Sequence, residues 1–205
     1  MTTRLLNLLL TVFIVTISLQ SSLAQCTTTI SSFPYYEGFE TDLGGWTGNT
    51  STSNPPTNGT WGRRSGGTGS NYTGPSSANE GSFYVYSEVS AQGAGTALDL
   101  ISPCFVLPAT GLPSLSFDFH MYTDTLNANT LGMGFLYIAI DTTQTSTGSW
   151  DTIGLISGTQ GDQWFNLHFG LSSYLGSTMR IRFQAVTGSG SFIYAGDRAI
   201  DNCLL

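Results

Sequence analysis

The stretch 115–121, LSFDFHM, alternates apolar and polar side chains without interruption. Side chains of a β-strand point alternately to its two faces, so this period of two predicts a strand rather than a helix. The leucine, the two phenylalanines and the methionine share one face, and the serine, aspartate and histidine share the other. We therefore expect one buried face and one solvent-exposed face, as in the sheets of an antiparallel β-sandwich.

The same pattern continues on both sides of this stretch. The segment 179–186 is also an expected strand, and over 180–186 Ile181, Phe183 and Ala185 alternate with polar residues. Other short alternating or aromatic-rich segments are bounded by glycine, serine, threonine, asparagine and proline, and are also expected to be strands: 83–88, 97–101, 134–141, 151–156, 163–169 and 199–204. No segment shows sustained helical periodicity. The sequence thus predicts an all-β fold of two antiparallel sheets.

The first 24 residues have the features of a secretory signal peptide. A positive start at Arg4 precedes a mostly apolar run over 5–19, and small residues at 22–24 fit a cleavage site. A membrane anchor is the alternative, but a spanning helix needs about 20 apolar residues and this run is shorter. No second stretch is long enough to cross a bilayer. We expect a secreted or cell-surface protein in which residues 25–205 form a single domain, without a transmembrane segment in the mature chain.

Charge is scarce and unbalanced in this chain. Only 9% of the residues are charged, no lysine is present, and the formal net charge is −7. Because nucleic-acid phosphates require a basic surface, this composition argues against a nucleic-acid partner. It suits an extracellular protein that can hold divalent cations.

Residues 47–79 differ from the rest of the domain because they are rich in glycine, serine, threonine, asparagine and proline. Trp61 and Tyr72 are their only large apolar side chains. We interpret the segment as a long polar loop, and a loop of this length inside a domain is either functional or partly mobile. It is not a domain linker, because the region before it needs later strands to complete a core.

The mature chain contains three cysteines, Cys26, Cys104 and Cys203. In an oxidising compartment this number implies one disulfide and one leftover thiol. We favour a Cys26–Cys104 disulfide, which would tie the N-terminal arm to the start of a strand. Cys26–Cys203 is the alternative, because the two ends of a domain often lie close together. Pairing of Cys203 with a residue outside this chain also stays open.

Sequence motifs of catalysis are missing. The chain has two histidines, His120 and His168, and contains no His-Glu-x-x-His zinc motif, no Gly-x-Ser-x-Gly elbow and no phosphate-binding glycine loop. His120 and Asp118 lie on the same polar strand face, and we interpret them as a hydrogen-bonded surface pair. The sequence therefore predicts a protein that binds rather than one that catalyses a reaction.

Acidic residues near the two ends of the domain suggest a cation site. Calcium takes about six to eight oxygen ligands, from carboxylates and from main-chain carbonyls in irregular segments. Glu40 follows an aromatic segment, Asp201 lies in the last expected strand, and antiparallel closure of the fold would bring them together. Asn79 and Glu80 precede the next strand and are further candidates. We expect these four residues to hold a structural Ca²⁺; ordinary exposed acids at strand ends are the alternative.

Exposed aromatic rings would indicate carbohydrate binding. The candidates are Trp61 in the polar loop and Tyr84 and Tyr86, which share one face of segment 83–88. Aromatic side chains of β-sandwiches are more often part of the core, because each of them buries a large apolar area. The three residues remain candidates for contact with a sugar ligand.

Several landmarks follow one another in a characteristic order over residues 33–205. They are 37–40 (EGFE), 44–46 (GGW), Trp61, 81–86 (GSFYVY), 100–103 (LISP), 115–122 (LSFDFHMY), 158–164 (GTQGDQW), 182–185 (RFQA) and 196–202 (GDRAIDN). In this order they resemble the MAM domain, an extracellular β-sandwich named after meprin, neuropilin and a receptor phosphatase. The resemblance is strongest to MAM domains of secreted bacterial proteins.

The resemblance implies a jelly-roll β-sandwich that serves adhesion, protein–protein contact or substrate positioning. Some family members hold a cation by acids of their end strands, which matches Glu40 and Asp201 here. Vertebrate members carry four cysteines, so their disulfide pattern does not transfer to this chain. We expect a non-catalytic module of a larger extracellular protein that binds an extracellular protein or a glycan. A carbohydrate-binding module and an accessory domain of a secreted protease are the alternatives.

Overall fold

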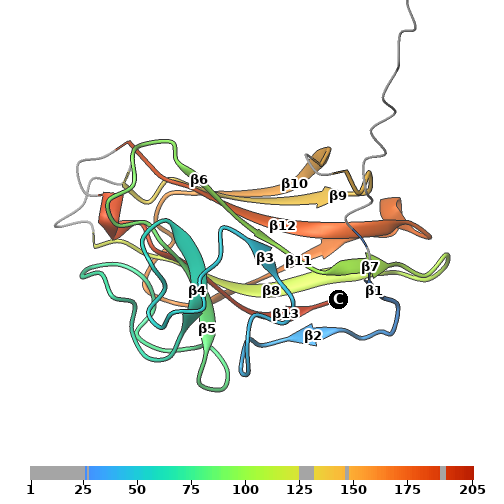
Figure 1. The fold of residues 1–205 in the computed structure, drawn as a ribbon, viewed down its shortest axis with the longest axis horizontal. Coiled ribbons are helices and arrows are strands. Elements are labelled where there is room, and N and C mark those ends of the chain that lie inside the picture. The colour runs from blue at the N-terminus through green and yellow to red at the C-terminus, as the bar shows by residue number, and fades with distance from the viewer. Residues whose placement is uncertain (1–25, 27, 125–131, 146–147, 190–192) are drawn as a thin grey trace, which may run out of the picture.

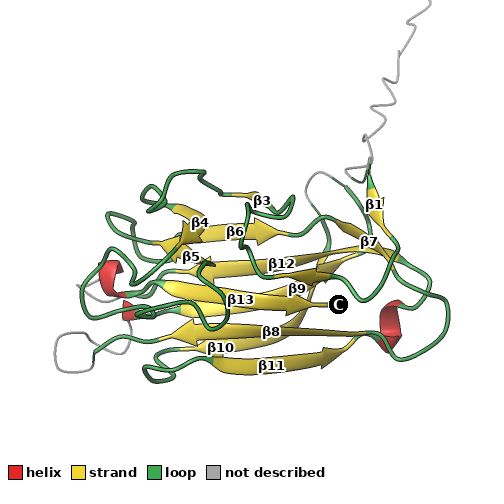
Figure 2. Ribbon diagram, turned by 90° about the horizontal axis from the view of Figure 1, so that it is seen from below, coloured by secondary structure: helices red, strands yellow, loops and turns green. Residues whose placement is uncertain are grey.

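Two β-sheets packed face to face form the part of the protein that the structure describes (Figure 1 and Figure 2). The structure is a computed structural model, and it describes residues 26, 28–124, 132–145, 148–189 and 193–205. The expected signal peptide, residues 1–24, lies outside these residues. The predicted all-β sandwich of two sheets is confirmed.

The seven-stranded sheet is built around β12 (Thr178–Val186), which pairs along both of its edges. On one edge lies β9 (Phe135–Asp141), followed by β10 (Trp150–Ser157). The other edge pairs with two short strands, and each of these has a further neighbour: β6 (Ala97–Ile101) with β3 (Thr47–Gly48), and β7 (Cys104–Val106) with β1 (Thr29–Ile30). The pairing of β1 with β7 is parallel, and the other pairings in this sheet are antiparallel.

The six-stranded sheet has the last strand of the chain, β13 (Arg198–Leu204), in its middle. The other five strands are β8 (Ser114–Met121) and β11 (Phe165–Gly170) on one side, and β5 (Tyr84–Glu88), β4 (Thr60–Arg64) and β2 (Tyr36–Glu37) on the other. Two 3-10 turns, η2 (Ser172–Tyr174) and η3 (Ile193–Ala195), complete the described elements. Within the described residues, no helix has the length and apolar character needed to cross a membrane.

All eight strands expected from alternation and composition are present, with ends shifted by at most two residues. Five strands were not predicted, namely β1, β2, β3, β4 and β7, and they are only two to five residues long. Segments this short do not show a period of two clearly enough to be recognised. Because β3 and β4 fall within residues 47–79, the interpretation of that segment as one long loop is wrong.

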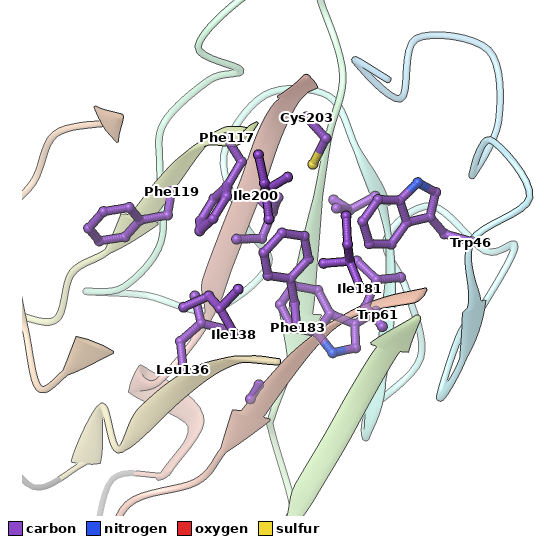
Figure 3. Close-up of a cluster of buried hydrophobic side chains, with 14 of the residues drawn as sticks. Trp46, Trp61, Phe117, Phe119, Leu136, Ile138, Ile181, Phe183, Ile200 and Cys203 are labelled. Carbon is purple, nitrogen blue, oxygen red and sulfur yellow. The ribbon is translucent and has the colours of Figure 1, made fainter. Parts of the chain in front are cut away.

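Aromatic side chains from both sheets fill the space between them (Figure 3). Phe183 of β12 contacts Phe117 of β8 edge to face, with ring centroids 4.7 Å apart. The same Phe183 ring stacks on Trp46 at 5.5 Å. Aromatic pairs of this kind add to the large apolar area that each ring already buries. The two sheets are therefore joined mainly by aromatic packing around Phe183.

Trp61 belongs to this core and not to a ligand site. It lies in β4, its side chain is fully buried, and its indole Nε1–H donates a hydrogen bond to the carbonyl of Leu98 at 3.0 Å. Its contact with Leu98, in the opposite sheet, helps to join the two layers. The prediction that Trp61 could stack on a sugar is therefore wrong, because no face of its ring is accessible.

Tyr84 and Tyr86 are also fully buried, on the outer face of β5. They form a second apolar cluster with Ala199, against which Ala78 and Trp164 pack. The chain between β4 and β5 covers this cluster, because Tyr84 donates its hydroxyl to the carbonyl of Gly66. The prediction of ligand contact is therefore wrong for these two tyrosines as well.

The same covering chain changes the surroundings of the polar face of β8. Asp118 and His120 are only 7% and 1% exposed, although alternation predicted a solvent-facing side for them. Trp164 lies against the His120 ring, with centroids 5.5 Å apart, and donates its indole N–H to the carbonyl of Ser77. The six-stranded sheet is thus buried on both faces in this region.

The Cys26–Cys104 disulfide is present, as favoured from the sequence. It joins the N-terminal arm to the first residue of β7, where Thr29 of β1 is the register partner of Cys104. Cys203 is a free cysteine and is only 2% exposed in the core. Burial raises the pKa of its thiol well above the ordinary value.

Replacing Trp61 with alanine is expected to destabilise the fold. The change deletes a fully buried indole and its hydrogen bond, and truncations of this kind cost about 3–5 kcal/mol. The midpoint of urea unfolding should therefore fall clearly. Tyr72→Ala is the control, because the Tyr72 side chain is 52% exposed and its removal should leave the midpoint nearly unchanged. A Trp61→Ala protein as stable as the wild type would contradict the place of Trp61 in the core.

Candidate metal centre

The two ends of the domain meet in the six-stranded sheet. β2 pairs antiparallel with the end of β13, so that Glu37 lies opposite Cys203 and Tyr36 opposite Leu204. Beyond this pair, the main-chain N–H and C=O groups of Tyr35 and Leu205 exchange two hydrogen bonds of 2.9 Å. The expected antiparallel closure of the fold is present, because the segment just before Glu40 lies beside the strand that carries Asp201.

Two buried carboxylates face each other next to this junction. Asp201 of β13 is the register partner of Asp118 of β8, and their side chains are 0% and 7% exposed. Burial raises the pKa of Asp201 to about 6, the hydrogen bonds that it accepts from main-chain N–H groups oppose the rise, and the charge of Asp118 adds to it. We call these two residues the acid pair.

The loop before β5 is held by Asp201 and by Glu40 through different residues. Asp201 Oδ2 accepts hydrogen bonds from the main-chain N–H groups of Asn79 and Glu80, at 3.0 and 3.3 Å. Glu40 Oε1 accepts hydrogen bonds from the next two N–H groups after Gly81, those of Ser82 and Phe83, both at 2.9 Å. Glu40 and Asp201 therefore both accept hydrogen bonds from one short loop, which we call the 79–83 loop.

Gly81 lies between the two sets of hydrogen bonds and has a positive φ of 63°. A β-carbon at this position would lie only 2.4 Å from Glu40 Oε1. The loop can therefore approach the Glu40 carboxylate this closely only because residue 81 is a glycine.

Asp118 is surrounded by asparagine side chains. Its Oδ2 accepts hydrogen bonds from the Nδ2 groups of Asn79 at 2.6 Å and Asn202 at 2.7 Å. Its Oδ1 accepts one from Asn166 Nδ2 at 2.8 Å. The Tyr36 hydroxyl completes the cluster, 2.6 Å from Asn202 Oδ1 and 3.2 Å from Glu80 Oε2.

The structure brings three of the four predicted ligands into contact, and the fourth contacts them only through the loop between them. Asp201, Asn79 and Glu80 are in direct hydrogen-bond contact, whereas Glu40 joins them through the 79–83 loop. Sequence reasoning missed Asp118, because alternation alone does not reveal which residue of the neighbouring strand lies opposite Asp201. Asn166, Asn202 and Tyr36 were also missed, because their side-chain contacts with the cluster depend on how the strands pair.

The donor set suits a hard cation in its chemistry. Carboxylate oxygens of the acid pair and amide oxygens of Asn79 and Asn202 are the ligand types that calcium prefers. An asparagine side chain can present either its nitrogen or its oxygen, so residues that now donate to Asp118 can instead offer oxygens to a cation. In the described part of the chain no three His, Cys, Asp or Glu residues are grouped closely enough to hold a metal ion by themselves. Binding would therefore depend on amide and main-chain oxygens, and the four ligands stay a prediction.

The histidines do not contribute to this cluster. His120 Nε2 lies 3.2 Å from Asp162 Oδ1, so the predicted pair with Asp118 is wrong, and burial lowers the pKa of the imidazole. Asp118 and His120 both sit on the outer face of β8, but the asparagines engage the first and Asp162 engages the second. His168 lies on the exposed side of β11, opposite Ser116 of β8.

Asp201→Ala should cost more stability than Glu40→Ala. The first change removes a fully buried acceptor and with it two partly buried hydrogen bonds to Asn79 and Glu80, each of which contributes about 1 kcal/mol. Glu40 is exposed, so water can replace its hydrogen bonds to Ser82 and Phe83. Urea unfolding in buffer with chelator measures both losses without a metal contribution. Equal losses for the two variants, or none for Asp201→Ala, would contradict this account of the loop.

Comparison with solved structures finds matches at low identity and with TM-scores below 0.5. The K1 cleaved adhesin domain of Lys-gingipain from Porphyromonas gingivalis W83 is 16% identical over 84% of this chain and 97% of that chain, with a TM-score of 0.48. The C-terminal family 22 carbohydrate binding module of Clostridium thermocellum Xyn10B is 16% identical, over 83% and 90% of the two chains, with a TM-score of 0.45. A cyclase from Fischerella sp. TAU is 19% identical, over 82% and 86%, with a TM-score of 0.49. These similarities are too distant to carry an argument about activity.

A family model gives a more specific result. The model described as "MAM domain, meprin/A5/mu" matches residues 38–205, which is most of the chain. The matched region begins just after β2 and includes the 79–83 loop, the acid pair and all of β13. The chain belongs to the MAM domain family.

Proposed function

We propose that this protein is a secreted, non-catalytic MAM module that mediates adhesion through an extracellular partner, either a protein or a glycan. The observation that carries the proposal is the family match over residues 38–205, because MAM domains are extracellular domains of adhesion and interaction. The Cys26–Cys104 disulfide supports an oxidising location.

The two ends of the sandwich carry different elements. The strands β1 and β7 and the C mark lie toward one end (Figure 1). The 3-10 turn η3 lies at the opposite end. A partner can therefore approach the outer face of the seven-stranded sheet and the loops at the η3 end. The aromatic core between the sheets keeps these surfaces fixed relative to each other.

We also propose a structural calcium ion at the candidate metal centre. Two facing carboxylates, 0% and 7% exposed, are hydrogen-bonded there to neutral N–H groups. A divalent cation would neutralise the acid pair and join the two chain ends to the 79–83 loop. Asp118, Asp201 and the side-chain or main-chain oxygens of Asn79 and Glu80 would hold it, with Glu40 fixing the loop from its other end.

Calcium should raise the melting temperature of the protein. A ligand that binds only the folded state stabilises it by about 2.7 kcal/mol at a concentration of one hundred times its Kd. Melting curves in excess chelator and in millimolar CaCl₂ measure the effect. Asp201→Asn should lose the calcium shift, whereas Asp151→Asn, a change at an exposed acid of β10, should keep it. A wild-type midpoint that is the same with and without chelator would remove the metal proposal.

The adhesion proposal is tested by binding of the purified mature protein to immobilised surface material from the organism that produces it. We expect saturable binding that a heat-unfolded sample does not show. Protease treatment of the surface removes protein partners, and periodate treatment removes glycan partners, so the two treatments tell which class is bound. Absence of saturable binding to untreated material would contradict the adhesion proposal.

A further inference from the structure

The outer face of the seven-stranded sheet differs from that of the six-stranded sheet, because several of its outward side chains remain accessible. Leu155 of β10 is 53% exposed and Phe135 of β9 is 37% exposed. Tyr137, Arg182 and Gln184 are half-buried on the same face. Large apolar and planar polar groups that remain accessible on a rigid sheet are candidates for ligand contact.

Aromatic rings occupy one side of this face. Phe135 and Tyr137 are two residues apart on β9 and therefore point the same way, with ring centroids 6.1 Å apart. Leu155 is the register partner of Tyr137 on the edge strand β10, and Ser157 is the partner of Phe135. The three apolar side chains form a continuous strip, which we call the aromatic strip.

Three planar polar groups lie beside the aromatic strip and are fixed by one another. Gln184 Nε2 donates to Asp99 Oδ1 at 2.8 Å, and Arg182 Nη1 lies 3.8 Å from Asp99 Oδ2. The Arg182 guanidinium is also held over the Trp150 ring, 4.5 Å from its centroid. Carboxylate, amide and guanidinium groups are thus presented in a preorganised set, which we call the polar trio.

The register of the strands places the aromatic strip and the polar trio in one row. Leu155, Tyr137, Gln184 and Asp99 are successive partners on β10, β9, β12 and β6. With about 4.8 Å between neighbouring strands, this row spans about 14 Å. The row therefore has the apolar side chains of Leu155 and Tyr137 at one end and the hydrogen-bonding groups of Gln184 and Asp99 at the other.

A hollow lies at each end of the same face. One has a volume of about 280 Å³ and is lined by Phe135, Ser157 and Val186 among others. The other has a volume of about 540 Å³ and is lined by Ile101 and Arg180 of this face together with residues of β1, β3, β7 and the loops beside them. Because β12 and its neighbours run from one hollow to the other, an extended ligand lying along the strands would reach both.

The charges on the face are internally matched. Arg182 lies against Asp99, and Arg180 is paired with the buried Asp141. Hydrogen bonds from Arg180 and Thr143 outweigh the effect of burial and lower the pKa of Asp141 to about 2, so this pair stays ionised near neutral pH. The face consequently offers little net charge to attract a highly charged partner, and it suits a neutral ligand with many hydroxyl groups.

We propose that the outer face of β10, β9, β12 and β6 binds a neutral oligosaccharide. The rings of Phe135 and Tyr137 pack against the C–H faces of the sugars, which aromatic surfaces complement. The polar trio exchanges hydrogen bonds with the hydroxyl groups, and its carboxylate and guanidinium can each engage two neighbouring groups. The proposal rests on the proposed function as a binding module and names its ligand class and surface.

The test is affinity gel electrophoresis of the mature protein in gels containing soluble polysaccharides. The neutral probes are xylan, mixed-linkage glucan, galactan and mannan, and the acidic probes are alginate and polygalacturonate. We expect at least one neutral polysaccharide to retard the protein more than the acidic ones do. Tyr137→Ala and Gln184→Ala, changes at the two parts of the row, should each weaken this binding about tenfold or more. Tyr72→Ala is the matched control, an exposed tyrosine outside this sheet, and should bind as the wild type does.

Melting temperatures of the three variants show whether each is folded, and Gln184→Ala carries the test if Tyr137→Ala is unstable. Failure of every neutral polysaccharide to retard the wild type would overturn the proposal. Wild-type affinity in both face variants, or retardation by the acidic probes alone, would overturn it too. If the protein binds periodate-treated but not protease-treated surface material, the adhesion function stands and only the oligosaccharide assignment falls.

Discussion

The pairing of β13 along both of its edges is the interaction on which the rest of the structure depends. The strand β13 lies between β8 on one side and β5 and β2 on the other, so the sheet cannot form before residues 198–204 are in place. Contacts between residues this far apart in sequence are typical of β-sandwiches and make their folding slow. The facing of Asp118 and Asp201, and through it the position of the 79–83 loop, follows directly from the register of β13.

Strands with a clear alternation were predictable because each must bury one face against the other sheet. The period of two in 115–121 and 180–186 identified β8 and β12, the strands that carry Phe117 and Phe183. The same rule failed for the outer face of β8, where Asp118 and His120 are buried beneath the chain that crosses that sheet. Alternation reports only that two faces differ; it does not report what a distant, glycine-rich segment covers. Trp61 was assigned to a loop because it lies in a short strand among polar residues, where no alternation is visible.

Part of the candidate metal centre was predictable from its position relative to the chain ends. Glu40 and Asp201 were identified as acids at the two ends, and both contact the 79–83 loop. Asp118 was not identified, because its role depends on a register of pairing that a single sequence does not fix. On the opposite sheet, the aromatic strip and the polar trio come from four strands that are scattered along the chain. These residues are close together because of the strand topology, so no local sequence motif could predict that they form one surface.

The burial of Cys203 links the redox state of the protein to the integrity of its last strand. The thiol is enclosed in the core, its pKa is raised, and the single disulfide lies on another strand, at Cys104. Thiol–disulfide exchange requires an accessible thiolate, so in the folded protein the unpaired sulfur cannot attack the existing bond or join a second molecule. Scrambled or intermolecular disulfides therefore form only from molecules in which β13 has detached, and each such event traps a chain that would otherwise refold. In an oxidising environment, the pairing of β13 therefore also protects the protein from incorrect disulfides.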